Sequence, residues 1–268
     1  MNILDTIVAQ KKVEVAKLPA RAITPEVLHE AVAQNGLRRD FIAALRAPRS
    51  GNVALIAEVK KASPSAGVIC NDFDPLRIAR EYEAAGASCL SVLTDEKFFQ
   101  GSLEYLKKIR QAVKLPLLRK DFVIDERQIL EAIEWGADAI LLIVAILDDQ
   151  QLRHFQTLAS AATLAVLVEV HNEAELDRAL AAEAKLVGVN NRDLKTFKVD
   201  LATTDRMAAK LWSSPGGKEK LLVAESGIHT RADVKRLRQC GARAILVGES
   251  LMRGESISLK AKELLGSS

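Results

Sequence analysis

The stretch Asp125–Ile143, DERQILEAIEWGADAILLI, contains the pattern that decides the fold. Ile129, Leu130 and Ile133 recur at helical spacing, and the aspartate that opens the stretch is suited to be the N-cap of that helix. Gly136 then ends the helix, because glycine readily adopts the left-handed backbone that follows many helices. The apolar run after it has the length of a buried strand. The stretch therefore predicts one helix–glycine–strand unit.

The same unit recurs along the chain. Gly86 and Gly241 also follow helical stretches, and each precedes an alanine and then an apolar run. The predicted strands are 53–60, 88–94, 116–120, 138–143, 164–170, 186–190, 220–225 and 244–248. The predicted helices between them are 75–85, 102–113, 125–135, 148–161, 172–182, 200–212 and 230–240.

Strands that are apolar on both faces and alternate with helices form a parallel sheet covered by helices. Eight such units favour an α/β protein closed into a (β/α)8 TIM barrel over an open, doubly wound sheet. No G-x-G-x-x-G follows the first strand and no Walker loop is present, which disfavours dinucleotide or ATP binding. Ahead of the barrel, 2–17 and 25–47 are predicted as two further helices. We expect one domain over 1–268, with a helical extension at 1–52 and the barrel at 53–268.

The composition argues against several functional classes. Of the 268 residues, 49% are hydrophobic and 27% are charged, which is typical of a globular protein. The net charge is only +3 and aromatic residues make up 4%, so nucleic-acid binding is disfavoured. The three cysteines, Cys70, Cys89 and Cys240, form no cluster with metal-ligand spacing. We therefore expect reduced thiols and no metal site.

The sequence shows no export or membrane signal. The first residues lack the charged start and continuous apolar core of a signal peptide. The longest apolar run, Ala139–Leu147, falls short of the roughly 20 residues that a membrane span needs. We expect a cytoplasmic protein that acts on a small molecule, without membrane, nucleic acid or an obligatory protein partner. Its oligomeric state cannot be derived from these patterns.

Polar residues stand at the carboxyl ends of several predicted strands, where a parallel barrel places its functional face. Glu58 and Lys60 end the first strand and are two apart, so they share one face. Later strands end in Lys120, Glu169, Asn190 and Glu225. Two lysines among three carboxylates are suited to general acid–base catalysis on an anionic substrate. Burial would lower the lysine pKa values and the carboxylates would raise them, and the sequence does not decide between the two. The alternative is an ion-pair network that only closes the top of the barrel.

The loops after the last two strands have features of a phosphate site. The stretches 224–228, AESGI, and 246–250, LVGES, place Gly227 and Gly248 where a strand gives way to a helix. Glycine lets backbone N–H groups approach a ligand, and these two loops often bind phosphate in such barrels. Tight turns alone are the alternative. The hydroxyl-rich loop 61–67 is a candidate lid.

Adjacent aromatics in the loop 95–101, together with Phe122 and the apolar end of strand 138–143, predict walls for an aromatic-sized pocket. Packing under a loop is the alternative. The histidines share no ligand spacing, so we expect surface or capping roles for them. They are His29, His154, His171 and His229.

Several motifs together resemble the indole-3-glycerol phosphate synthase family. They are 56–65 (IAEVKKASPS), 93–102 (LTDEKFFQGS), 118–122 (LRKDF), 168–170 (VEV), 189–194 (VNNRDL) and the two glycine loops above. The resemblance covers essentially the whole chain, and its E-x-K-x-x-S-P-S and R-K-D-F motifs are the most specific.

The resemblance implies an activity. Enzymes of this family convert 1-(2-carboxyphenylamino)-1-deoxyribulose 5-phosphate to indole-3-glycerol phosphate, with loss of CO₂ and water, in tryptophan biosynthesis. They need no metal or organic cofactor. Three other interpretations stay open at this stage: a Schiff-base aldolase, a phosphosugar isomerase barrel, and a barrel kept only as a binding subunit.

The resemblance also implies residue roles. Lys120 would be the general acid of ring closure, and Glu169 would deprotonate or orient the anilinic nitrogen. Lys60, held by Glu58, is the candidate acid for dehydration. The residues implied to hold hydroxyls and the lysine network are Asn190 and Glu225. Those implied for phosphate are Ser63, Ser226, Gly227, Gly248 and Ser250, and those for the anthranilate pocket are Phe99, Phe122, Leu141 and Leu194, with Arg192 in support.

Overall fold

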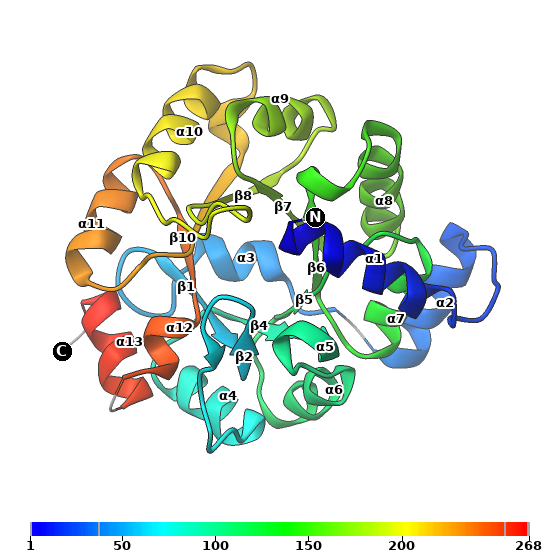
Figure 1. The fold of residues 1–268 in the computed structure, drawn as a ribbon, viewed down its shortest axis with the longest axis horizontal. Helices are drawn as coiled ribbons and strands as arrows, with labels where there is room; N and C mark the ends of the chain where they lie inside the picture. The colour runs from blue at the N-terminus through cyan, green and yellow to red at the C-terminus, as the bar shows by residue number, and fades with distance from the viewer. Residues whose placement is uncertain (1, 37, 255, 267–268) are drawn as a thin grey trace.

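The computed structural model describes residues 2–36, 38–254 and 256–266 and shows a closed parallel barrel (Figure 1). Its strands pair in the order β1-β10-β9-β8-β7-β6-β5-β4, and β4 pairs with β1 to close the ring. The barrel strands are β1 (Ala54–Val59), β4 (Cys89–Leu93), β5 (Leu117–Lys120), β6 (Ala139–Ile143), β7 (Ala165–Val170), β8 (Leu186–Asn190), β9 (Leu221–Glu225) and β10 (Ala244–Val247). The predicted (β/α)8 barrel is confirmed.

Helices surround the barrel as an outer layer (Figure 1). They are α4 (Pro75–Ala84), α6 (Leu103–Ala112), α7 (Arg127–Glu134), α8 (Asp149–Ala161), α9 (Glu173–Ala181), α10 (Ala202–Ser213), α11 (Arg231–Gln239) and α13 (Ile257–Leu265). Shorter elements are β2 (Ala62–Ser63), β3 (Gly67–Val68), α5 (Glu96–Phe99), α12 (Glu249–Met252), and the 3₁₀ helices η1 (Val144–Ile146) and η2 (Gly217–Glu219). Within the described residues, no helix combines the length and apolar character needed to cross a membrane.

The helix–glycine–strand units form as predicted. Gly86, Gly136 and Gly241 have φ angles of +92°, +88° and +102°, the left-handed backbone that glycine adopts without strain. One detail of the deciding stretch is wrong. Helix α7 begins at Arg127 rather than 125, and Asp125 is not its N-cap. The Asp125 carboxylate instead accepts hydrogen bonds from the backbone N–H and the guanidinium of Arg127.

Within the described residues ahead of the barrel, 2–36 and 38–53, there are three helices and not two. They are α1 (Ile3–Val15), α2 (Pro25–Asn35) and α3 (Phe41–Arg46). The single helix predicted over 25–47 is wrong, because α2 ends before Gly36, whose φ of +82° is left-handed. Phe41 and Leu45 of α3 join the apolar cluster inside the barrel, beside the amino end of β1.

The side-chain alternation of β1 directs its last polar residue into the barrel. Ala54 and Ile56 belong to the interior cluster, whereas Leu55 and Ala57 pack outward against the helices. Because side chains alternate along a strand, Glu58 continues the inward series at the carboxyl end. The charge therefore lies at the mouth of an otherwise apolar interior.

Helix α1 crosses the end of the barrel that holds the carboxyl ends of the strands (Figure 1). Its residues Ile3 and Ile7 line the cavity there. Lys11 of α1 is only 4% exposed, and its Nζ lies 3.1 Å from Asp95 Oδ2 and 2.8 Å from Asp121 Oδ1. Burial alone would lower the pKa of Lys11, but the two carboxylates outweigh it and hold the pKa above its ordinary value. An ion pair therefore fixes α1 to the end of β5.

Replacing this lysine tests how strongly α1 is held. In Lys11→Met, two buried carboxylates lose their shared cation, and we expect the free energy of unfolding to fall by about 3–5 kcal/mol. The neighbouring Lys12 is exposed, so Lys12→Met should change it by no more than about 0.5 kcal/mol. Urea denaturation of both variants measures the difference. Equal stability of the two variants would contradict the anchoring role.

Candidate active site

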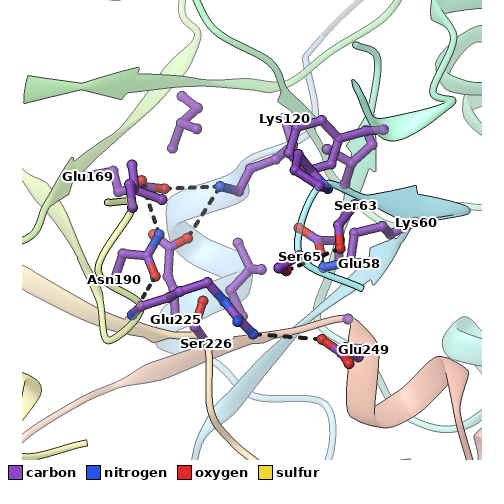
Figure 2. A pocket seen from close by; sticks show the side chains of 18 of the residues that line it. Glu58, Lys60, Ser63, Ser65, Lys120, Glu169, Asn190, Glu225, Ser226 and Glu249 are labelled. Carbon is purple, nitrogen blue, oxygen red and sulfur yellow. Dashed lines mark hydrogen bonds and ion pairs between the residues drawn. The ribbon is translucent and has the colours of Figure 1, made fainter. Parts of the chain in front are cut away.

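A cavity opens at the carboxyl ends of the strands, and the polar residues predicted for this face all line it. They are Glu58, Lys60, Lys120, Glu169, Asn190 and Glu225. Figure 2 shows Lys120 reaching toward Glu169 and Glu225, with Glu58 and Lys60 on another side of the same cavity. Strands far apart in the sequence therefore bring these groups into one site.

Lys120 occupies the centre of the charge network. Its Nζ lies 3.0 Å from Glu169 Oε2 and 3.5 Å from Glu225 Oε2. Burial would lower the pKa of Lys120, but Glu169, Glu225 and Glu58 outweigh it and raise the pKa well above its ordinary value. The sequence did not decide whether burial or the carboxylates have the larger effect on the lysine pKa. In the structure the carboxylates have the larger effect, and the charged ammonium is favoured.

The two carboxylates that contact Lys120 differ in their protonation. Glu169 Oε1 also accepts a hydrogen bond from Asn190 Nδ2 at 3.2 Å, and the Asn190 amide is oriented because its Oδ1 accepts from the Arg192 backbone N–H at 3.0 Å. Burial disfavours the charge of Glu169, but the cations around it keep its pKa well below the usual range. For Glu225, burial and the carboxylates of Glu169 and Glu58 outweigh Lys120 and raise the pKa to about 8. The surroundings therefore favour the ionised form of Glu169 and the protonated form of Glu225.

Two glycines leave room for the carboxylates of Glu225 and Glu58. A Cβ at Gly188 of β8 would collide with Glu225 Oε1, and a Cβ at Gly248 would collide with Glu58 Oε1. Lys60 Nζ pairs with that same Glu58 oxygen at 2.6 Å. Gly248, predicted for phosphate, therefore also shapes the Glu58–Lys60 pair, and Gly188 is a site residue that the sequence analysis missed.

The residues predicted for phosphate line the same cavity. They are Ser63, Ser226, Gly227, Gly248 and Ser250. Ser226 and Gly227 have successive left-handed φ angles of +64° and +74°, which turn the chain sharply after β9. The Ser250 hydroxyl donates to the Ile228 carbonyl at 2.7 Å, so it ties the two glycine loops together.

The apolar wall is larger than predicted. Phe99 and Phe122 have ring centroids 6.0 Å apart, and Leu141 and Leu194 also line the cavity. Arg192 lies at the rim, with Nη2 3.7 Å from Glu249 Oε2. Ile143, at the predicted apolar end of its strand, also lines the cavity, and apolar wall residues that the analysis missed include Ile3, Leu4, Ile7, Phe197 and Leu246. The spacing of residues 3, 4 and 7 places them on one face of a helix, and this was the signal that the sequence offered for them. The spacing did not show which part of the protein that face covers.

His171 has a contact that the sequence analysis missed. The N-cap of α9 is Asn172, so the predicted capping role for His171 is wrong. The His171 Nε2 atom instead lies 3.2 Å from Glu169 Oε1. Of the other histidines, His29 bonds the Ala161 carbonyl and His154 pairs with Glu126 at the surface. His229 lines the cavity.

Metal and thiol chemistry find no obvious site in the part of the chain that the structure describes. Among those residues no group of three or more His, Cys, Asp or Glu side chains could hold a metal ion. Cys70, Cys89 and Cys240 are free thiols.

The fold and the site define a class: a (β/α)8 barrel whose cavity at the carboxyl ends of the strands brings lysines and carboxylates together beside an apolar wall. A family model described as indole-3-glycerol phosphate synthase matches residues 4–264. The chain therefore belongs to the indole-3-glycerol phosphate synthase family, and it is a decarboxylating cyclase of tryptophan biosynthesis.

Relatives with this name are similar over their full lengths. The indole-3-glycerol phosphate synthase of Polaromonas sp. (strain JS666) is 52% identical over 266 residues, covering 99% of this chain and 98% of that protein. That of Roseiflexus sp. (strain RS-1) is 51% identical over 273 residues, covering 100% and 99%. The solved structure of 3-hexulose-6-phosphate synthase from Salmonella typhimurium has a TM-score of 0.62 at 13% identity, covering 80% of this chain and 97% of that one, and supports the fold alone.

The space above Gly188 can be filled by substitution. In Gly188→Ala the new methyl group displaces the Glu225 carboxylate, so we expect kcat to fall at least tenfold, with a stability cost of about 1–3 kcal/mol. Indole fluorescence measures turnover. Gly216 has open space around a left-handed backbone, so Gly216→Asn is the matched control and should keep wild-type kcat. Wild-type kcat in Gly188→Ala would show that the position of Glu225 is unimportant.

Proposed function

We propose that this cavity binds 1-(2-carboxyphenylamino)-1-deoxyribulose 5-phosphate and converts it to indole-3-glycerol phosphate, CO₂ and water. The observation that carries the proposal is the Lys120 ammonium, whose Nζ lies 3.0 Å from Glu169 Oε2 and 3.5 Å from Glu225 Oε2. This arrangement supplies a proton donor and a proton acceptor within a few ångströms of each other. Family membership supports a small phosphorylated substrate for the site.

Ring closure uses Lys120 and Glu169. The arene carbon that bears the carboxylate attacks the ribulose carbonyl carbon, and the Lys120 ammonium protonates the carbonyl oxygen as its charge develops. Ionised Glu169 can only accept hydrogen bonds, so it orients or deprotonates the anilinic N–H. The bond to the carboxylate then breaks, CO₂ leaves, and its electron pair restores the aromatic ring.

Dehydration uses the Glu58–Lys60 pair. Lys60 Nζ, fixed at 2.6 Å from Glu58 Oε1, is placed to protonate the leaving hydroxyl so that it departs as water. The methylene carbon next to the ring nitrogen then loses a proton to a carboxylate of the site, and the C–H electron pair forms the double bond that completes the indole. Asn190 and protonated Glu225 hold substrate hydroxyls and the Lys120 network.

The remaining lining residues bind the two ends of the substrate. We assign the phosphate to Ser63, Ser226, Gly227, Gly248 and Ser250. We assign the anthranilate ring to Phe99, Phe122, Leu141 and Leu194, with Arg192 in support. Because α1 lines the cavity and α3 enters the barrel interior, we also propose that residues 1–268 form one domain. A cytoplasmic location without an obligatory protein partner stays a prediction.

A Schiff-base mechanism is the main rival, and the electrostatics of the site disfavour it. A lysine nucleophile must be neutral, whereas the carboxylates around Lys120 hold it charged. Borohydride treatment in the presence of substrate tests the point. A covalent adduct on Lys120 would replace the acid role by a nucleophilic one.

Removing either partner of the central pair tests the acid–base roles. We expect Lys120→Met and Glu169→Gln each to lower kcat at least a hundredfold, the scale of a general acid or base, while circular dichroism shows a folded barrel. Lys108 is exposed on α6, so Lys108→Met is the control for loss of a lysine and should keep wild-type kcat. Near wild-type turnover in either active-site variant would refute its role.

The protonated state of Glu225 predicts a pH dependence. Its pKa is raised to about 8, so the proton is present below that pH and is lost as the pH rises through it. We expect wild-type kcat to fall through about pH 8. In Glu225→Gln, which does not titrate, the remaining activity should show no fall there. The pH–rate profiles of the wild type and of Glu225→Gln measure both expectations. If the variant kept the fall in kcat near pH 8, that fall would belong to another titrating group.

A further inference from the structure

His171 connects the proposed base to a second carboxylate outside the cavity. It follows β7, and its Nε2 lies 3.2 Å from Glu169 Oε1. Its Nδ1 lies 3.0 Å from Glu175 Oε2 in the first turn of α9. The ring is therefore placed between two carboxylates, and its side chain is only 12% exposed.

Glu175 fixes the ring in this position. Its Oε2 accepts the His171 backbone N–H at 2.8 Å, and its Oε1 accepts from Asn172 Nδ2 at 2.7 Å. Asn172 in turn caps α9, since its Oδ1 accepts the Glu175 N–H at 3.0 Å. With both Glu175 oxygens held, the carboxylate cannot follow a moving ring. His171 is consequently a rigid link from α9 to Glu169.

The geometry requires a charged ring. A neutral imidazole has one N–H and one lone pair, so one of the two carboxylates would face a lone pair. Protonation of both nitrogens removes that repulsion. Burial opposes the charge, but Glu169 and Glu175 outweigh it and raise the pKa of His171 to about 10. Nε2 has no hydrogen-bond partner of good geometry among the described residues, so its effect on Glu169 at 3.2 Å is that of a nearby cation.

The His171 cation lies beside only one of the two carboxylates that contact Lys120. Glu169 and Glu225 both contact Lys120, and each of the two carboxylates disfavours the charge of the other. Glu169 has Asn190 and His171 as further partners. Glu225 Oε1 has no hydrogen-bond partner within the described residues and lies against Gly188. The charged groups around the His171 ring are thus Glu169 and Glu175, with Lys120 and Glu225 beyond Glu169.

We propose that the His171–Glu175 pair determines which of the two Lys120-bound carboxylates is ionised, so that Glu169 accepts the substrate proton and Glu225 carries one. His171 touches no reacting atom in this scheme. It is a positioning residue that acts through the charge of Glu169, and Glu175 acts through His171. The inference rests on the proposed function, which makes Glu169 the base.

The first test is the pH–rate profile of His171→Gln. Glutamine keeps an N–H donor close to the place of Nε2 but carries no charge. Without the cation, Glu169 takes up a proton at higher pH, so the acid limb of kcat should move upward by at least one pH unit. Glu175→Gln should move it in the same direction by less. His154 forms a similar pair with Glu126 at the surface, so His154→Gln is the matched control and should leave the profile unchanged.

The second test does not depend on turnover. Carbon-13 NMR of labelled glutamate side chains, with the Glu169 signal assigned by its loss in Glu169→Gln, reports the titration of Glu169 itself. Its midpoint should rise by at least one pH unit in His171→Gln. A lower kcat with an unmoved limb and an unmoved midpoint would overturn the proposal and leave His171 a structural role.

The two tests separate this inference from the proposed function. If Glu169→Gln kept its turnover, the base role would fail, but the NMR midpoint would still decide whether His171 sets the charge of Glu169. If His171→Gln did not fold, Glu175→Gln decides by the same midpoint. An unmoved Glu169 midpoint in that variant would then overturn the proposal.

Discussion

The active site depends on the cost of burying the Lys120 ammonium at the mouth of an apolar barrel. A buried cation is stable only when carboxylates lie close enough to offset its lost hydration. Glu169 and Glu225 meet that need, but their own burial creates a second cost, which raises the pKa of Glu225. The network of carboxylates around Lys120 is thus a consequence of stabilising one lysine.

Strand register places these groups. Asn190 of β8 pairs in register with Glu225 of β9, and Glu169 of β7 pairs with Gly188 of β8. Alternation along β8 puts Gly188 and Asn190 on one face, so a position without a side chain lies beside the Glu225 carboxylate. A slip of one residue would turn the polar ends outward. The register of the closed sheet therefore sets where the polar side chains of the site lie.

The N-terminal helices complete the site from outside the barrel strands. Helix α3 contributes Phe41 and Leu45 to the barrel interior, and α1 adds apolar walls to the cavity at the carboxyl ends. The charge of Lys11 is offset by Asp121, the residue after Lys120, so the ion pair that holds α1 adjoins the catalytic strand end. Helix α1 thus both takes part in a stabilising ion pair and forms part of the cavity wall.

The sequence by itself determined the eight strand–helix units, the glycine stops and the shared face of Glu58 and Lys60, because helical and strand periodicities and glycine's backbone freedom are local properties. It also carried signals that were not used, such as Gly36 inside the helix predicted over 25–47. Only the tertiary structure decided that His171 meets Glu169, that α1 covers the cavity, and that the surroundings raise the pKa of Glu225 and lower that of Glu169. Those outcomes depend on distances and burial among residues far apart in the chain, and electrostatic energies follow those quantities rather than residue spacing.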